Sequence, residues 1–320
     1  MAVDLRRIRD YFTAPVCPPT IIQVTSSYMS GIHVDVKDGR AKRHAVLELP
    51  PGLLEPHFDR KNIADAAALS GVLKEGIREL QASGKKVACL VPEACLKIFV
   101  LSFDSLPASE KEREKIIRWR AKKQMAILPE DTRLSYETVA SSSSVKVLAA
   151  LARTPVIREY EDLFAGLGLE VGIASAPTIS LLNLVDWENE KDLLVANIEQ
   201  DSLGLIAVTQ SEPALYRLKT FPVEREGELR FSQKIEAAVK EIENTAHFIE
   251  DREKREVRSL WFRSGLRESQ ADILAGLRAS FPFEVRQVQA PPSSGLGPEA
   301  SAFLAPLAGQ VPWRKNLSAG

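Results

Sequence analysis

Hydrophobic and polar positions near the start of the chain predict three short antiparallel strands followed by a helix. The strands are expected over 21–24, 31–36 and 45–49, with Asp38-Gly39 as the tight turn between the second and the third. Apolar residues then recur at helical spacing over 65–82, and Ser83-Gly84 offers a C-terminal cap. A strand of the buried type is expected over 86–91.

The second half of the chain repeats this order. Three strands are expected over 193–198, 203–209 and 214–220, followed by a long helix over 229–251. A strand, a helix and a strand follow over 257–262, 269–280 and 284–289, then a linker over 290–298 and a short helix over 299–307. The long helix carries an apolar stripe made of Phe231, Ile235, Val239, Ile242, Ala246 and Ile249. The repeated plan predicts an internally duplicated α/β fold.

A unit with a different pattern lies between the two repeats, at about 93–158. Its strands are expected over 97–103, 134–140 and 145–151, with a serine turn over 141–144. Its helix is expected over 110–126, where Ser109 and Glu112 match a capping box. Two more helices, over 155–166 and 178–187, flank a strand over 170–173. We therefore expect a first domain over 1–190 that contains this inserted unit, a second domain over 191–311, and a flexible tail over 312–320.

Two strand-turn-strand segments, 20–34 and 193–206, have the layout of phosphate-binding hairpins. A magnesium-nucleotide site needs an acid at the strand end and glycine where backbone N–H groups approach the phosphates. Gln23 and Asn197 stand at the acid positions, and Thr25 and Glu199 stand at the glycine positions. A carboxylate at position 199 would also repel phosphate. The sequence predicts a site that keeps the frame of a nucleotide pocket without its chemistry.

Composition sets ordinary bounds for a soluble globular protein. The 320 residues are 45% hydrophobic and 27% charged, and the net charge of −1 disfavours nucleic acid as a partner. No apolar run reaches the roughly 18–20 residues that cross a bilayer, and the charged segment 1–13 does not resemble a secretory signal. Cys17, Cys89 and Cys95 have no metal-ligand spacing, so reduced thiols in the cytosol are expected, with Cys89 and Cys95 in the core.

Other candidate chemistry is weak. The four histidines are isolated in sequence and are expected to be ordinary surface or core residues: His33, His44, His57 and His247. The hydroxyl clusters at 25–27 and 141–144 lack a His-Asp pair that would make a nucleophile. Glu199 and Asp201 are expected to be exposed turn charges, with metal binding as the alternative. The segment 1–13 is expected to be a frayed or packed terminus, with a short membrane-touching helix as the alternative.

The helix expected over 110–126 is strongly basic. Seven Lys or Arg residues face three Glu residues, and the simplest interpretation is a solvated face with pairs such as Glu114–Arg118. The alternative is a docking face for an acidic partner or for an anionic membrane leaflet. The apolar side of the helix, made of Ile116, Ile117 and Met125 with Trp119 at its margin, is expected to pack in the core.

Several segments resemble the PilM family of type IV pilus assembly proteins, which belongs to the actin-like ATPase superfamily. They are 91–93, 99–105, 117–131, 134–139, 147–152 and 163–170, and the likeness covers about 20–290 in organisation. It implies an actin-like, ribonuclease H-like duplicated two-domain fold with a small inserted α/β subdomain. It also implies that a groove between the inserted unit and the core binds the short cytoplasmic N-terminal tail of PilN, a bitopic inner-membrane protein. Candidate residues for that groove are Ile116, Trp119, Gln124 and Met125.

The chain departs from the family at the nucleotide site. The family's first hairpin usually carries Asp-hydrophobic-Gly and a later lysine, where this chain has Gln23, Thr25 and Ser30. The glycine pair that receives adenosine is reduced to Ser264-Gly265, and the segment between Phe221 and Glu228 is short. The positions of such a vestigial site are Gln23, Thr25, Ser26, Ser27, Ser30, Asn197, Glu199, Asp201 and Gly265. We expect no cofactor and no catalysis, with ATP and magnesium as the open alternative.

These inferences predict a non-catalytic cytoplasmic scaffold of a type IV pilus or related secretion machine, held at the inner membrane through its partners. The expected partners are a PilN-like bitopic protein and, further, pilus motor ATPases, but not nucleic acid. Two alternatives stay open. One is an active actin-like ATPase that positions metal through Glu199 or Asp201, and the other is a cytoplasmic platform component of a type II secretion system.

Overall fold

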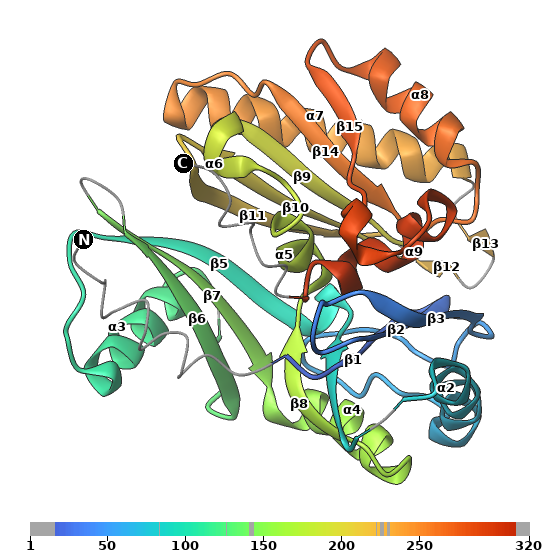
Figure 1. The fold of residues 1–320 in the computed structure, drawn as a ribbon. Helices are drawn as coiled ribbons and strands as arrows, with labels where there is room; N and C mark the ends of the chain where they lie inside the picture. The colour runs from blue at the N-terminus through green and yellow to red at the C-terminus, as the bar shows by residue number, and fades with distance from the viewer. Residues whose placement is uncertain are drawn as a thin grey trace.

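The computed structural model describes residues 17–82, 84–125, 127–140, 144–221, 223–224, 227–228 and 231–311. Two five-stranded sheets and a three-stranded sheet form the body of this described part (Figure 1). The expectations for segments 1–13, 141–143 and 312–320 lie outside it. No helix in the described ranges is long and apolar enough to cross a membrane.

The first sheet has the strand order β3-β2-β1-β4-β8. Strands β1 to β3 are antiparallel neighbours, as the alternating pattern predicts, while β4 and β8 run parallel to β1. Its elements are β1 (Thr20–Val24), β2 (Tyr28–Val34), β3 (Ala41–Glu48), α2 (Ala66–Leu80), β4 (Lys86–Leu90), α4 (Thr154–Gly166) and β8 (Glu170–Ser175). Helices α2 and α4 pack over a core that includes Cys89 and Cys95, both of which are buried as expected.

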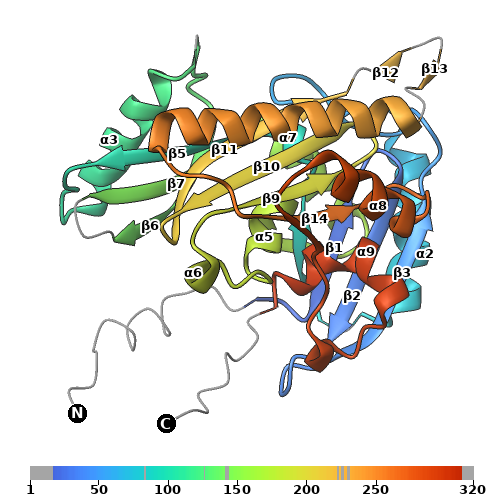
Figure 2. The same ribbon diagram turned by 90° about the horizontal axis from the view of Figure 1, so that it is seen from above.

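The second sheet repeats the first, with the order β11-β10-β9-β14-β15. Its elements are β9 (Leu193–Ile198), β10 (Ser202–Thr209), β11 (Glu212–Thr220), α7 (Phe231–Glu253), β14 (Ser259–Ser264), α8 (Gln270–Ser280) and β15 (Glu284–Gln287). A two-residue pair, β12 (Val223–Glu224) and β13 (Gly227–Glu228), precedes α7. Figure 2 shows α7 lying along the sheet, as its predicted apolar stripe requires. Residues at or just after the carboxyl ends of β1, β4, β9 and β14 line the same cleft region between the two sheets.

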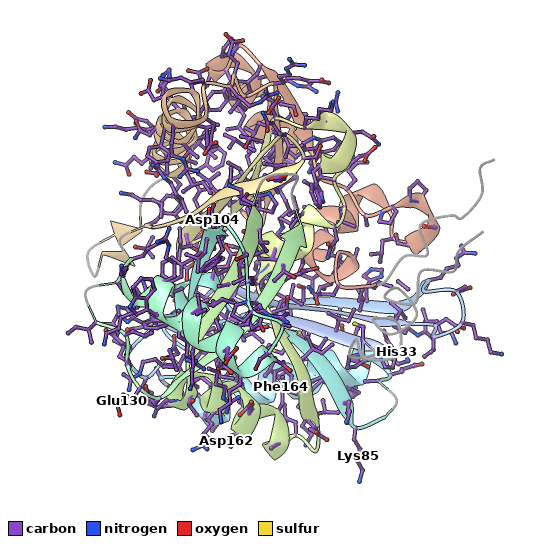
Figure 3. All side chains as sticks on the ribbon, turned by 90° about the vertical axis from the view of Figure 1, so that its left-hand side faces the viewer. His33, Lys85, Asp104, Glu130, Asp162 and Phe164 are labelled. Carbon is purple, nitrogen blue, oxygen red and sulfur yellow. The ribbon has the colours of Figure 1, made fainter. Side chains whose placement is uncertain are left out.

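The inserted unit is a three-stranded sheet of order β5-β7-β6 with one helix on its outer face. Its elements are η1 (Glu93–Cys95), β5 (Leu96–Phe103), α3 (Glu110–Lys122), β6 (Thr132–Ala140) and β7 (Val145–Arg153). Ile117 and Ala121 of α3 are fully buried against Leu101 and Val147. Figure 3 looks at this unit from outside and labels Asp104 and Glu130, which stand before and after α3 in the chain. On its inner side β5 contacts β11 of the second sheet.

Two helices connect the halves by packing across them. Helix α5 (Pro177–Leu182) covers β9 of the second sheet, whereas α9 (Pro298–Ala308) covers β1 and β2 of the first. The two helices touch each other, and Asn183 Nδ2 donates to the carbonyl oxygen of Gly309 at 2.9 Å. The short segments α6 (Trp187–Glu190) and η2 (Pro292–Ser294) complete the order of elements. The last helix thus packs on the first sheet although it follows the second in sequence.

Local details correct three expectations. Helix α2 is capped at its C-terminus by Gln81, whose φ of 48° is left-handed, instead of by Ser83-Gly84. Ser109 precedes α3 but its side chain makes no capping hydrogen bond, so the capping box is absent there. The helix expected over 178–187 is broken into α5 and α6 at the place where Asn183 bonds to Gly309. A tertiary hydrogen bond of this kind leaves no periodic signal in the sequence.

Candidate functional site

The two hairpin turns singled out in the sequence meet at the cleft between the halves. Gln23, at the end of β1, donates through Nε2 to Glu199 Oε1 at 3.0 Å. The Tyr28 hydroxyl, at the start of β2, lies 2.9 and 3.0 Å from the two carboxylate oxygens of Glu199. Each of these three side chains is at most 6% exposed. Glu199 is therefore a buried contact between the halves, and the expectation of an exposed turn charge at this position is wrong.

Arg263, near the end of β14, completes this contact. Its guanidinium is fully buried and forms an ion pair with Glu199 through Nη1. Nη1 also donates to Asn197 Oδ1 at 2.9 Å, and Nη2 donates to the Tyr28 hydroxyl at 2.6 Å. Nε donates to the carbonyl oxygen of Ala302 in α9. All three guanidinium nitrogens thus have acceptors, which is the condition under which a buried arginine is tolerated.

Burial and ion pairing have opposite effects on the pKa values of Glu199 and Arg263. Burial raises the pKa of Glu199, while the Arg263 guanidinium and the Tyr28 hydroxyl oppose that shift. For Arg263, burial alone would lower the pKa, but the Glu199 carboxylate and Tyr28 outweigh it, and the pKa is raised. The donors that converge on Glu199 are those that a carboxylate needs, so we treat the pair as ionised.

A glycine at position 265 gives this network its space. A Cβ atom there would collide with Glu199 Oε2 and would come within 2.8 Å of the Tyr28 hydroxyl. Gly265 therefore serves the close approach of the Glu199 and Tyr28 side chains.

We expect Gly265→Ala to lower the free energy of unfolding by about 1–3 kcal/mol, because the added methyl group displaces the Glu199 carboxylate from Arg263. Gly276→Ala, in α8, is the matched control, since a Cβ at that glycine meets nothing within 4 Å. Urea unfolding of both variants measures the difference. Equal free energies of unfolding for the two variants would mean that the Glu199–Tyr28–Arg263 network accommodates the methyl group without loss of stability.

A small cavity lies behind the two turns. Its volume is about 10 Å³, and it is lined by Gln23, Thr25, Pro92, Glu93, Pro177, Asn197, Glu199, Asp201 and Ser202. Gln23 Oε1 and Asn197 Nδ2 have no hydrogen-bond partner among the residues that the structure describes. A cavity of this size holds about one water molecule, and one water would satisfy that acceptor and that donor. A phosphate group does not fit there.

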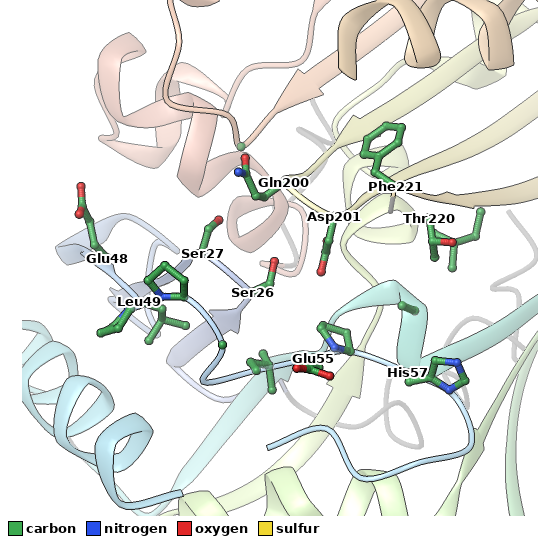
Figure 4. A pocket seen from close by; sticks show the side chains of 18 of the residues that line it. Ser26, Ser27, Glu48, Leu49, Glu55, His57, Gln200, Asp201, Thr220 and Phe221 are labelled. Atoms are coloured by element: carbon green, nitrogen blue, oxygen red, sulfur yellow. The ribbon is translucent and has the colours of Figure 1, made fainter. Parts of the chain in front are cut away.

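A much larger cleft opens beside this cavity, with a volume of about 1130 Å³. Its walls come from the turns at 26–27 and 200–201, the segment 48–60, β5, the end of β11, and the loop after β14. Ser26 and Asp201 point toward each other across it (Figure 4). Burial raises the pKa of Asp201, and a hydrogen bond from the Ser202 hydroxyl to Oδ1, at 3.1 Å, opposes that shift. Glu48 and Arg267, one from each half, form an exposed ion pair at the edge.

A second buried acid, Glu93, lies where the inserted unit begins. Oε1 accepts from the backbone N–H of Thr178 in α5 at 2.6 Å, and the side chain is packed against β10. A Cβ at Gly204 of β10 would collide with Glu93 Oε2, so this packing requires glycine. Burial raises the pKa of Glu93 to about 7, against the hydrogen bond from the Thr178 backbone N–H, and the charge of Glu199 adds to the rise.

The remaining predicted residues divide into two groups. Thr25 shapes the first turn, since its hydroxyl accepts from the Tyr28 backbone N–H at 3.0 Å, and Ser30 is buried in β2. The four groove candidates lie around α3 and line neither cavity: Ile116, Trp119, Gln124 and Met125. Trp119 is 55% exposed and Ile116 is 37% exposed, so the expectation that they pack in the core is wrong. Whether a partner covers them stays a prediction.

Three residues of the site escaped the sequence analysis: Tyr28, Glu93 and Arg263. Arg263 did carry a signal, because it is the single charge inside the strand Ser259–Ser264. Lys234 of α7 is also buried, at 4% exposure, and its charge lowers the pKa of Asp201.

In the described ranges no group of three or more His, Cys, Asp or Glu side chains is arranged to hold a metal ion.

Comparison with known proteins identifies the fold. No family model and no curated protein matches the sequence. Among solved structures, one described as a PilM–PilN type IV pilus biogenesis complex is similar over 93% of this chain and 98% of its own, at 17% identity and a TM-score of 0.75. A Bacteroides thetaiotaomicron protein with an actin-like ATPase fold covers 97% of this chain and 99% of its own, at 10% identity and a TM-score of 0.53.

A third similar structure is the cytoplasmic domain of EpsL, an inner membrane component of the type II secretion system of Vibrio cholerae. It covers 94% of this chain and 98% of its own, at 12% identity and a TM-score of 0.53. The predicted actin-like two-domain α/β fold is therefore confirmed, and the structural likeness to a PilM–PilN complex agrees with the resemblance found in the sequence.

Proposed function

We propose that this protein is a non-catalytic assembly platform that binds the cytoplasmic N-terminal tail of a PilN-like bitopic inner-membrane protein. It would work on the cytoplasmic face of a type IV pilus or related secretion machine and connect that partner to motor ATPases. The observation that carries the proposal is the likeness to the PilM–PilN complex over nearly the full length of both chains. The likeness to the EpsL cytoplasmic domain supports the same kind of machine.

The absence of turnover is supported by the contact between Arg263 and Glu199. A hydrolase of this fold needs an open space between its two hairpins for phosphate and metal, whereas here that space is filled by a buried ion pair and a cavity of about 10 Å³. Asp201 and, when ionised, Glu93 line that cavity beside the Glu199–Arg263 pair and would repel a phosphate anion.

The large cleft has the chemistry of a peptide site. Its apolar wall includes Leu49, Leu54, Phe58, Leu218 and Phe221, which offers pockets for alternate side chains of an extended peptide. Charged side chains of both signs also line the cleft and can form hydrogen bonds with the backbone and polar groups of a tail. They are Glu48, Glu55, Arg60, Lys97, Asp201, Arg267 and Glu268. Lys97 of β5 also lines the cleft, so the cleft borders the inserted unit as well as the two halves, and we propose that the tail binds there.

Calorimetry with the tail peptide of a bitopic membrane protein encoded beside this chain tests the proposal. We expect Leu218→Asp to weaken binding at least tenfold, since a charge in the apolar wall must be desolvated. Val36→Asp is the matched control, because Val36 is 78% exposed and lies outside the cleft. No binding of the peptide, or equal weakening by both substitutions, would contradict the proposal.

One observation favours the ATPase alternative, namely that the large cleft is roomy enough for a nucleotide and is lined by Ser26, Asp201 and Gly265. Calorimetric titration with magnesium-ATP separates the two functions. The platform proposal expects no saturable heat. Micromolar binding that Asp201→Ala abolishes would favour the ATPase.

A further inference from the structure

The outer face of α3 is the most unusual part of the described surface. Six large hydrophobic side chains are exposed in the described ranges, and three of them lie within one stretch of twelve residues: Ile116, Trp119 and Ile127. Only Ile117 and Ala121 of the helix are buried in the inserted unit. The helix therefore uses one narrow stripe for packing and presents an aromatic and an aliphatic side chain to solvent.

Positive charge surrounds these apolar side chains. The helix and its cap, 110–123, carry seven Lys or Arg and three Glu, in a chain whose net charge is −1. Glu114 is paired with Arg118 at 2.9 Å, and Arg113 donates to the carbonyl oxygens of Pro107 and Ala108. The cations that remain on the exposed side are Lys111, Lys115, Arg120, Lys122 and Lys123. Glu110 and Glu112 are exposed on the same helix, so its outer side keeps a net positive charge, whereas the rest of the chain is net negative.

The ammonium group of Lys123 lies 3.7 Å from the centre of the Trp119 ring. An indole with lysines around it, on an exposed helix, is the combination that sits at the boundary between lipid headgroups and acyl chains. Each Lys or Arg close to an anionic leaflet contributes about 1 kcal/mol, and an indole adds apolar burial without crossing the bilayer.

We propose that the outer face of α3 binds directly to an anionic membrane surface, with Trp119 and Ile116 in the headgroup region and the lysines against lipid phosphates. This contact goes beyond the tail-binding function and does not depend on it. It would hold the inserted unit against the inner leaflet while the cleft, which α3 does not line, receives its own partner.

Co-sedimentation of the full chain with vesicles tests the proposal. We expect binding to vesicles of 70% phosphatidylcholine and 30% phosphatidylglycerol, at least tenfold weaker binding to pure phosphatidylcholine, and loss of binding as salt rises. Lys115→Glu combined with Lys122→Glu is expected to lower binding at least tenfold. The matched control, Lys74→Glu combined with Lys240→Glu, changes the net charge equally at exposed positions of α2 and α7.

Trp119→Ala separates insertion from simple charge attraction. It is expected to weaken vesicle binding about three- to tenfold and to remove a blue shift of tryptophan emission that vesicles cause in the unmodified chain. All variants change exposed side chains, and thermal melts check that they fold. Equal loss in the control pair, no effect of Trp119→Ala, or binding of a polyglutamate peptide without binding of vesicles would overturn the proposal. The last result would assign the face to an acidic protein.

Discussion

Arg263→Met is expected to lower the free energy of unfolding by about 3–5 kcal/mol. Methionine fills a similar volume but leaves Glu199 as a buried acid without its cation, and removing one partner of a buried ion pair has costs of this size. Tyr28 and Gln23 remain as donors, so part of the carboxylate's need is still met. Denaturant unfolding at pH 7 measures the loss.

The same variant should recover at low pH. Without Arg263, the main opposition to the burial-induced rise in the pKa of Glu199 is gone and only the neutral donors remain, so the carboxyl takes up a proton more readily in the folded state. The cost of Arg263→Met should therefore shrink as pH falls toward the pKa of an unfolded glutamate and grow as pH rises. Adding Glu199→Gln to Arg263→Met should restore stability in the same way at neutral pH, because no buried charge is left.

A partly exposed ion pair supplies the control. Arg286 pairs with Glu190 at 2.7 Å, but its side chain is 37% exposed, so Arg286→Met is expected to cost less than about 1 kcal/mol. If Arg263→Met were as mild as Arg286→Met, the network would not hold the halves together, and the case against an open nucleotide site would lose its main support.

Periodicity sufficed to predict the fold because each half packs its strands and helices in the order of the chain. The strand over Leu193–Ile198 has the boundaries expected for it, and most other elements differ by one to three residues at an end. Packing between the two halves leaves no pattern in the sequence. Nothing in the pattern of α9 indicates that it returns to β1 and β2, since its apolar residues would suit either sheet.

From the sequence, only the loss of nucleotide-binding residues at the site could be predicted. The sequence shows that Gln23 and Glu199 stand where acid and glycine would serve a nucleotide, but it does not show that they touch each other. Their contact depends on a sequence separation of 176 residues and on Arg263, which is 64 residues further on. The partner of a buried charge is set by tertiary structure. The sequence alone therefore favours an exposed carboxylate at Glu199.

Glu93→Gln is expected to remove a pH dependence of stability worth about 3 kcal/mol. The pKa of Glu93 is about 7 in the folded protein against 4.5 for an unperturbed glutamate, so folding raises the pKa of this carboxyl group. Below pH 4.5 both states hold the proton, and the contribution to stability is fully present. Between pH 4.5 and 7 only the folded state holds it, so the free energy of unfolding falls by about 1.4 kcal/mol per pH unit. Above pH 7 the loss is complete.

Glutamine keeps the acceptor for the Thr178 N–H and cannot ionise. The variant should match the unmodified chain near pH 5 and exceed it at pH 8, with the difference growing through the interval between. Urea unfolding at half-unit steps of pH measures this divergence. Glu114→Gln, an exposed residue of α3, controls for the substitution itself and should give curves parallel to those of the unmodified chain. Parallel curves for Glu93→Gln as well would mean that Glu93 is solvated or paired in a way that its burial against Gly204 and Thr178 does not allow.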